Sequence, residues 1–95
     1  MKQQKKIANR DIRFVFKAAP GSKVYLIGSF NRWNSKKTIL SGPDDSGNYS
    51  VTLSLQEGHY EYLFVVNGEW QTDPVNPRFA LNAVGIWSSV IEVVG

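Results

Sequence analysis

The sequence predicts an all-β fold, an immunoglobulin-like antiparallel β-sandwich of roughly six to eight short strands. Apolar and polar residues alternate with a period of two along several segments, which is the pattern of half-buried strands. Helical periodicity is not sustained in any segment of the sequence. Residues that favour turns separate the alternating segments about every ten positions. A small Greek-key barrel is the alternative fold.

The first strand is expected over residues 11–18, where apolar positions alternate with arginine and lysine. A turn with proline and glycine then leads into a mostly apolar strand at 24–28. The polar stretch that follows is expected to be a loop with one short edge strand at 38–40. The segment 43–47 favours a turn, because its proline presets φ and its glycine admits positive φ. Residues 49–55 then form the most regular alternation in the chain.

The second half of the chain predicts a hairpin. Residues 59–66 alternate as a strand, and the Asn-Gly pair at 67–68 favours a type I′ turn, in which both central residues have positive φ. The two prolines of 73–77 lack amide hydrogens, which excludes that segment from a sheet ladder. Residues 87–94 form the last predicted strand. Trp87 is in phase with apolar residues of that strand, so we expect its indole to pack in the core.

Length and charge limit the class of protein. The chain has 95 residues, which is the size of one small domain with one core. Its formal charge is +3, but residues 1–10 hold four basic residues and no acid, which leaves seven basic and eight acidic residues in 11–95. We therefore expect a flexible basic segment over 1–10 and a single near-neutral domain over 11–95. Nucleic acid is not favoured as a partner, because its recognition needs basic residues clustered on a folded face.

The sequence offers little for catalysis. The absence of cysteine excludes disulfides, thiolate metal sites and thiol nucleophiles. The acidic residues are scattered, and the single histidine, His59, has neither a serine elbow nor a cluster with metal-ligand spacing around it. No signal peptide and no apolar run near the roughly 20 residues that span a bilayer is present. We expect a cytoplasmic protein that is not an enzyme and does not bind membranes.

Two tryptophans are the candidate binding residues. Trp33 and Trp70 are flanked by Asn, Arg, Glu and Gln, whose burial without partners would cost several kcal/mol, so we do not expect these indoles to be wholly buried. Exposed flat aromatics favour ligand contact. Two structural roles compete with that interpretation: Trp33 as a cap over the end of the sandwich, and Trp70 as a cross-strand partner of Val65 or Leu63.

Motifs in a fixed order carry a resemblance to a known family. The segments 24–33, 57–62, 66–70 and 73–74 together resemble the glycogen- and starch-binding module found before the catalytic domains of isoamylases and branching enzymes. The same module occurs in the β subunit of AMP-activated protein kinase. The resemblance covers about residues 11–95. It implies a carbohydrate-binding domain of early-set immunoglobulin-like fold that binds α-1,4-linked glucan without a cofactor, with a glycogen-metabolising enzyme or a kinase as a further partner.

The resemblance also implies a set of site residues. Two stacking tryptophans of the family match Trp33 and Trp70. Where glycogen-binding members have a lysine, a threonine and an asparagine, this chain has Leu63, Ile86 and Ser88. These three residues offer fewer polar groups for hydrogen bonds to sugar hydroxyls. The loop residues Lys36 and Lys37 are candidates to replace the missing donor. The full expected set of carbohydrate-binding residues is Trp33, Trp70, Leu63, Val84, Ile86 and Ser88.

The loss of polar donors leaves a second hypothesis open. A domain of the same fold that has lost sugar binding would serve as a protein-protein interaction or scaffolding module, with the aromatic surface or an exposed strand edge as its contact. Saturable binding of soluble α-glucan distinguishes the two hypotheses.

Overall fold

The computed structural model describes residues 9–82 and 85–94 of the chain. No helix in this part is long and apolar enough to cross a membrane. The predicted flexible segment at 1–10 lies outside the described residues except for Asn9 and Arg10, which begin the first strand. The elements in chain order are β1 (Asn9–Lys17), β2 (Val24–Gly28), the 3-10 helix η1 (Ser29–Asn31), β3 (Asn48–Gln56), β4 (Gly58–Val66), β5 (Glu69–Gln71), β6 (Phe79–Leu81) and β7 (Trp87–Val93).

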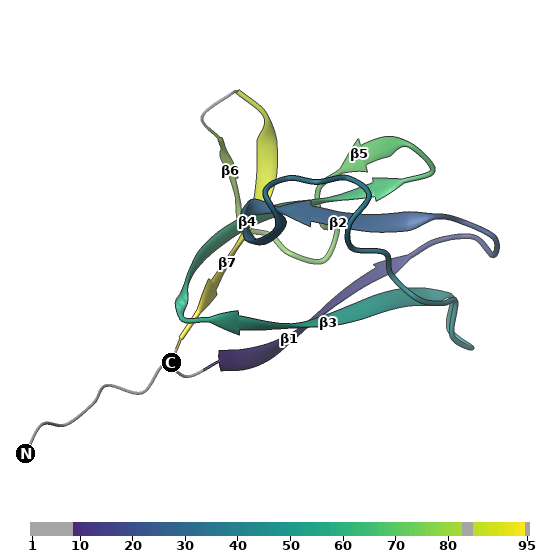
Figure 1. The fold of residues 1–95 in the computed structure, drawn as a ribbon. Coiled ribbons are helices and arrows are strands. Elements are labelled where there is room, and N and C mark those ends of the chain that lie inside the picture. The colour runs from purple at the N-terminus through teal and green to yellow at the C-terminus, as the bar shows by residue number, and fades with distance from the viewer. Residues whose placement is uncertain (1–8, 83–84, 95) are drawn as a thin grey trace, which may run out of the picture.

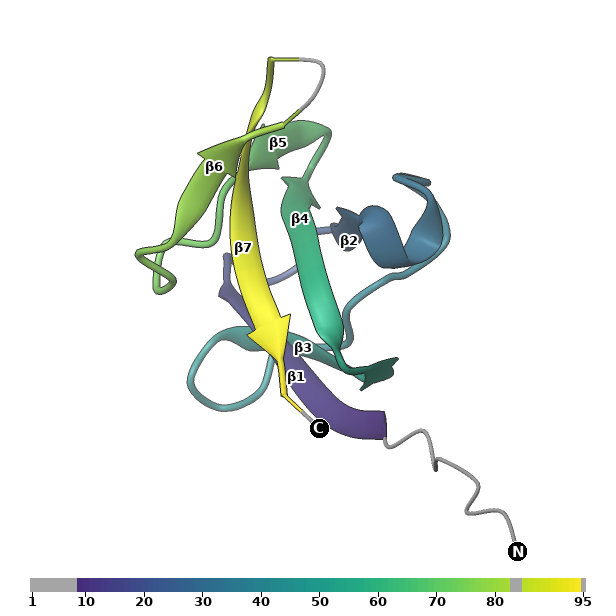
Figure 2. The same cartoon turned by 90° about the vertical axis from the view of Figure 1, so that its left-hand side faces the viewer.

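The strands form two antiparallel sheets. β1 and β3 pair with each other along their full length, and β2, β4, β7 and β6 follow one another in the larger sheet, where β5 also pairs with β4. Figures 1 and 2 show the β1–β3 sheet on one side of the molecule and the larger sheet on the other. The prediction of an antiparallel β-sandwich is confirmed.

The core lies between the two sheets. Phe14 and Phe16 of β1 meet Tyr62 and Phe64 of β4 across the interface, with ring centroids 5.0 Å apart in the pairs Phe14–Tyr62 and Phe16–Phe64. Each buried aromatic of this kind contributes roughly 1.5–3 kcal/mol by leaving water. The other buried members of this cluster are Val24, Leu26, Leu40, Tyr49, Leu55, Val66 and Val93.

Two elements differ from the prediction. Ile39 forms only an isolated bridge to Tyr25, so the edge strand expected at 38–40 is reduced to one bridged residue. β6 was not predicted, because a three-residue strand is too short for a period of two to be visible. Pairing with β7 alone defines β6 as a strand.

The prediction that the Trp87 indole packs in the core is wrong. Its side chain is 56% exposed and does not pack in the core. β7 pairs with β4 only as far as Ser89, which lies opposite Tyr62, and the residues before Ser89 continue beside β6. Trp87 lies opposite Leu81 in that extension, beyond the part of β7 that β4 covers. In Figures 1 and 2 the β6–β7 pair projects away from the β1–β3 sheet, which leaves no second layer to cover it.

Candidate functional site

One edge of β4 is shared by two strands. β7 pairs with β4 from Gly58 to Tyr62, and β5 pairs with the same strand from Phe64 to Val66. Neither pairing includes Leu63, so the two partners separate at this residue. A groove of about 520 Å³ opens where they separate. It is lined by Leu63, Trp70, Gln71, Thr72, Pro74, Ile86 and Trp87.

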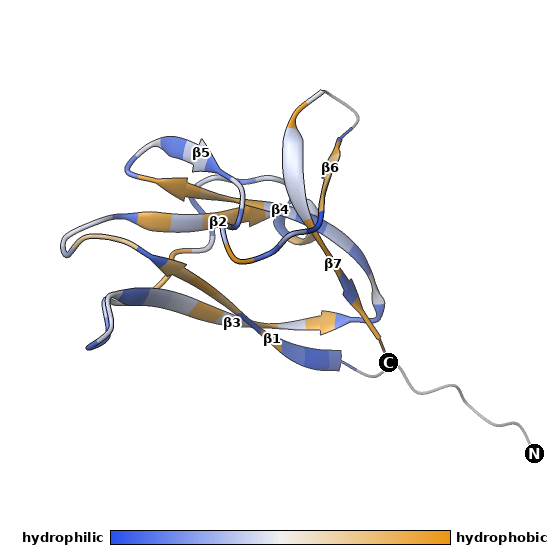
Figure 3. Ribbon diagram, turned by 180° about the vertical axis from the view of Figure 1, so that it is seen from behind, coloured by the Kyte–Doolittle hydropathy of each residue, from blue (hydrophilic) through white to orange (hydrophobic). Residues whose placement is uncertain are grey.

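Trp70 is held on β5 by the hairpin that the sequence predicts. Asn67 and Gly68 have φ values of 50° and 88°, as a type I′ turn requires. Trp70 lies opposite Val65 in the resulting ladder, so the predicted cross-strand pairing is present. The side chain nevertheless remains 51% exposed. Figure 3 shows the contrast within the hairpin: the end of β4 is strongly hydrophobic, whereas β5 is hydrophilic to neutral.

A second groove lies beside Trp70. It has a volume of about 350 Å³ and also contains Lys36, one of the candidate donors. Trp70 therefore borders two grooves, one lined by uncharged residues and one that contains two lysines. The residues of the second groove are Lys23, Tyr25, Ser35, Lys36, Val65, Asn67, Gly68 and Trp70.

Trp33 is placed by a strained turn. Arg32 and Trp33 both have positive φ, 59° and 58°, which costs side-chain-bearing residues of order 1–3 kcal/mol each. The Trp33 amide donates to the carbonyl of Gly28, 2.9 Å away. The partly buried indole packs against Ile27, Leu63 and Val65, on the face of the larger sheet that points away from β1 and β3.

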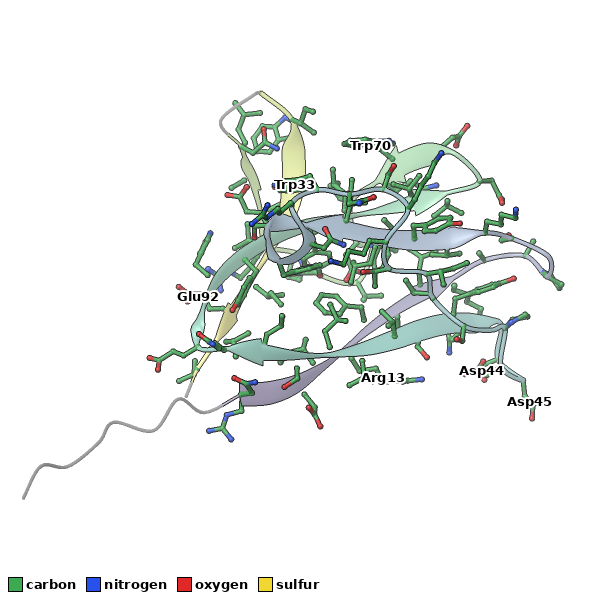
Figure 4. All side chains as sticks on the ribbon, viewed as in Figure 1. Arg13, Trp33, Asp44, Asp45, Trp70 and Glu92 are labelled. Atoms are coloured by element: carbon green, nitrogen blue, oxygen red, sulfur yellow. The ribbon has the colours of Figure 1, made fainter. Side chains whose placement is uncertain are left out.

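The outer position of Trp33 bears on both of its predicted roles. The indole covers a small apolar cluster of its own and does not cap the core between the sheets. Figure 4 shows Trp33 and Trp70 on the same side of the molecule, opposite Arg13, Asp44 and Asp45. Both candidate tryptophans thus belong to the outer face of the larger sheet.

Asn31 holds this turn together from inside. Its Oδ1 accepts a hydrogen bond from the Gly28 amide at 3.0 Å, and its Nδ2 donates to the Leu26 carbonyl at 2.9 Å and to Thr38 Oγ1 at 3.2 Å. The side chain is buried, and these bonds satisfy it. Strain at Arg32 and Trp33 persists because the surrounding contacts determine the turn.

The other predicted site residues occupy different depths. Leu63 is only 2% exposed and borders the groove, and Ile86 is 39% exposed on the β7 side of it. Ser88 is fully buried, with its hydroxyl 3.5 Å from both Glu61 Oε1 and the Ala80 carbonyl. Ser88 is not among the residues that line the groove. Val84 lies outside the described residues.

Gln71 and Thr72 are polar residues of the groove to which the sequence analysis gave no role. They follow Trp70 directly, Gln71 as the last residue of β5 and Thr72 in the loop after it, and that adjacency was the available signal. No hydrogen bond within the described residues uses either side chain. Both side chains can therefore donate to and accept from a ligand without breaking an internal bond.

The loop after the groove is anchored in the core by Asp73. The Tyr62 hydroxyl donates to Asp73 Oδ2 at 2.7 Å, and the Asp73 amide donates to Ser89 Oγ at 2.7 Å. Asn76 donates to the Tyr62 hydroxyl and to the Val90 carbonyl. Burial, together with the nearby Asp73 carboxylate, raises the pKa of Tyr62 well above its ordinary value. The network fixes the wall of the groove to β4 and β7.

Residues 10–95 match the family described as the glycogen recognition site of AMP-activated protein kinase. The chain belongs to this family. The resemblance noted from the sequence is confirmed, and non-catalytic glycogen or starch binding is the function class of such a module. The groove beside Trp70 also contains Leu63 and Ile86.

Three relatives illustrate where such modules occur. The chain is 38% identical over 63 residues to Protein FLOURY ENDOSPERM 6, chloroplastic, of rice (Oryza sativa subsp. japonica), covering 66% of this chain. It is 36% identical over 73 residues, 77% of this chain, to the 5′-AMP-activated protein kinase subunit beta-1 of both pig (Sus scrofa) and human (Homo sapiens). The chain spans 12%, 56% and 25% of the rice, pig and human relatives, respectively.

Proposed function

We propose that this chain binds α-1,4-linked glucan through the groove between β5 and β7, with glucose rings stacked on Trp70 and, farther along the same face, on Trp33. The observation that carries this proposal is the half-exposed Trp70 indole, fixed by its backbone pairing to Val65 and bordering an open groove. The axial C–H face of a pyranose is apolar, and a rigid indole offers it a large contact area with little entropy to lose.

The polar residues of the groove suit a neutral, hydroxyl-rich ligand. Gln71 and Thr72 supply donors and acceptors for sugar hydroxyls, which must find partners when they leave water. They stand in for the donors absent at Leu63 and Ile86. Because the groove is open and leaves much of a ligand in water, we expect Kd values between μM and mM, or about −8 to −4 kcal/mol.

The groove is proposed to bind without catalysis. Its described lining residues carry no carboxylate, imidazole or thiol, so they offer no general acid, general base or nucleophile of the usual kind. Two of the relatives are named as subunits of a kinase. We infer from this that the module brings an attached or associated enzyme to α-glucan.

A titration tests the proposal. Maltoheptaose and β-cyclodextrin are added to the ¹⁵N-labelled protein while amide and indole N–H signals are followed. We expect saturable shifts at Trp70 and Trp33, loss of most affinity in Trp70→Ala, and a smaller loss in Trp33→Ala. Val94→Ala is the control, because Val94 is an exposed apolar residue outside both grooves. Circular dichroism checks that each variant is folded.

One observation favours a second candidate function. Leu63 and Ile86 make the groove more apolar than the family pattern does, as a protein-binding surface would be. If millimolar sugar leaves the indole signals of the folded parent unchanged, glucan binding has been lost and a protein-interaction role replaces it.

A further inference from the structure

The Trp87 side chain is exposed, although the packing of the sandwich does not require an aromatic residue at this position. Its indole is more than half exposed, and its register partner Leu81 is also exposed. An exposed aromatic at the end of a hairpin adds little to the core, since the apolar area it keeps in water contributes nothing to folding. Both residues belong to the β6–β7 pair, which projects away from the β1–β3 sheet in Figures 1 and 2.

The orientation of Trp87 is fixed by a neighbouring ring. Phe79 of β6 lies on the same face of the β6–β7 pair, and the two ring centroids are 5.6 Å apart with planes at 80°. Edge-to-face contacts of this kind between aromatic rings are favourable. The indole is thus held in place before any ligand arrives, which lowers the entropic cost of using it as a binding surface.

Trp87 borders the same groove as Trp70. Trp70, Gln71 and Thr72 reach the groove from β5 and the loop after it, whereas Ile86 and Trp87 reach it from the start of β7. The groove volume of about 520 Å³ lies within the range of about 300–1,000 Å³ that is typical of small-molecule sites. An indole on β5, another on β7, and the polar side chains of Gln71 and Thr72 match an oligosaccharide that has several ring faces and many hydroxyls.

We propose that Trp87 is a second stacking surface that extends the Trp70 site, so that successive glucose residues of one α-glucan chain contact both indoles. This inference rests on the proposed function, because Trp70 must bind glucan first. The α-1,4 linkage turns each ring relative to the one before it, so a curved chain presents ring faces to surfaces on two different strands. Trp87 then sets the preference for longer chains, and Phe79 acts as its positioning residue.

The test compares short and long ligands. Affinities of the parent, Trp87→Ala and Trp87→Phe are measured by calorimetry for maltotriose and maltoheptaose. We expect Trp87→Ala to weaken maltoheptaose binding by about tenfold. Binding of maltotriose, which is short enough to be held at Trp70, is expected to change by less than about twofold. Trp87→Phe, which keeps an aromatic face, should retain most of the affinity for the longer ligand.

Two further variants separate this inference from the proposed function. Trp70→Ala should weaken the binding of both ligands. Phe79→Ala should weaken the binding of maltoheptaose only, because it removes the ring that contacts Trp87. If Trp87→Ala changes the affinity for both ligands equally, or changes neither affinity, then the proposal of a second stacking surface is wrong. The proposal of glucan binding at Trp70 is unaffected by that result. If the parent binds neither ligand, the proposed function and this inference fail together. The Trp87 indole N–H, which should shift with maltoheptaose and much less with maltotriose, gives an independent readout.

Discussion

The Tyr62 hydroxyl and the Asp73 carboxylate, 2.7 Å apart and both buried, tie the middle of β4 to the loop that borders the groove. Tyr62 is also a core residue whose ring meets Phe14 across the two sheets. A single side chain therefore links the packing of the sandwich to the wall of its candidate sugar site. Loss of this hydrogen bond should affect both stability and binding.

Tyr62→Phe tests this link. The substitution keeps the ring and removes the donor, which leaves Asp73 Oδ2 buried without that partner, so we expect a loss of about 1–3 kcal/mol in the free energy of unfolding. Urea denaturation measures it. Tyr60→Phe is the matched control, because the Tyr60 hydroxyl bonds the Gln56 carbonyl in an exposed position. Equal losses in the two variants would contradict the role assigned to Asp73.

The contribution of Tyr62 to the stability of the fold should depend on pH in the alkaline range. Because the folded-state pKa of Tyr62 is raised above the ordinary value of 10.0, its contribution to stability is fully present below pH 10 and decreases as pH rises from there toward the folded-state pKa. We expect the Tyr62→Phe variant to lose less stability than the parent between pH 9 and pH 11, measured as the change in urea midpoint. If the urea midpoints of the two proteins decreased in parallel with pH, Tyr62 would not be the cause of the loss of stability.

Gly28 has no room for a side chain. A Cβ at this position would lie 2.5 Å from the Glu61 carbonyl oxygen and 2.8 Å from the Phe30 ring, and the carbonyl belongs to the paired backbone of β4. We expect Gly28→Ala to destabilise the protein by about 1–3 kcal/mol through overpacking. Gly58→Ala is the control, since its Cβ would meet Tyr60 at an ordinary 3.6 Å. Thermal unfolding of both variants decides the comparison.

Asn31 should position Trp33 as well as stabilise the fold. Asn31→Ala removes the hydrogen bonds to Gly28, Leu26 and Thr38 and leaves buried backbone groups unpaired, at a cost of about 1–3 kcal/mol. At a temperature where the variant is still folded, the Trp33 indole N–H should shift and glucan affinity should fall. Asn34→Ala, which removes only an exposed bond to the Lys36 amide, should change neither.

Leu63→Lys tests whether the groove is the family's sugar site. The family resemblance implies a lysine at this position in glycogen-binding members, and the stem of a lysine can remain over the apolar cluster while its ammonium group reaches the groove. One added hydrogen bond of about 1 kcal/mol corresponds to roughly fivefold tighter binding of β-cyclodextrin. Leu63→Met controls for side-chain length without a donor. A gain with methionine as large as with lysine would argue against a missing donor.

The strands and the hairpin were predictable because their signals are local. Alternation defined β3 and β4, and the Asn-Gly pair at 67–68 defined the turn that presents Trp70. The groove was not predictable, because it depends on β7 leaving β4 at Ser89 and β5 joining it at Phe64. The β4–β7 pairing joins residues far apart in the sequence, whereas the β4–β5 pairing belongs to the local hairpin. Trp87 was misassigned for the same reason, since periodicity shows phase but not where a neighbouring layer ends.

The shared edge of β4 makes ligand preference separable from folding. The core residues lie on the opposite face of β4, and the groove is bordered by β5, by the start of β7 and by the loop pinned through Asp73. Substitutions at Gln71 and Ile86, which line the groove and lie outside the core cluster, would change the groove while the packing between the two sheets stays the same. A module built in this way can diverge in the glucan it selects by changes in a few residues of β5 and of the start of β7, with the core between its sheets unchanged.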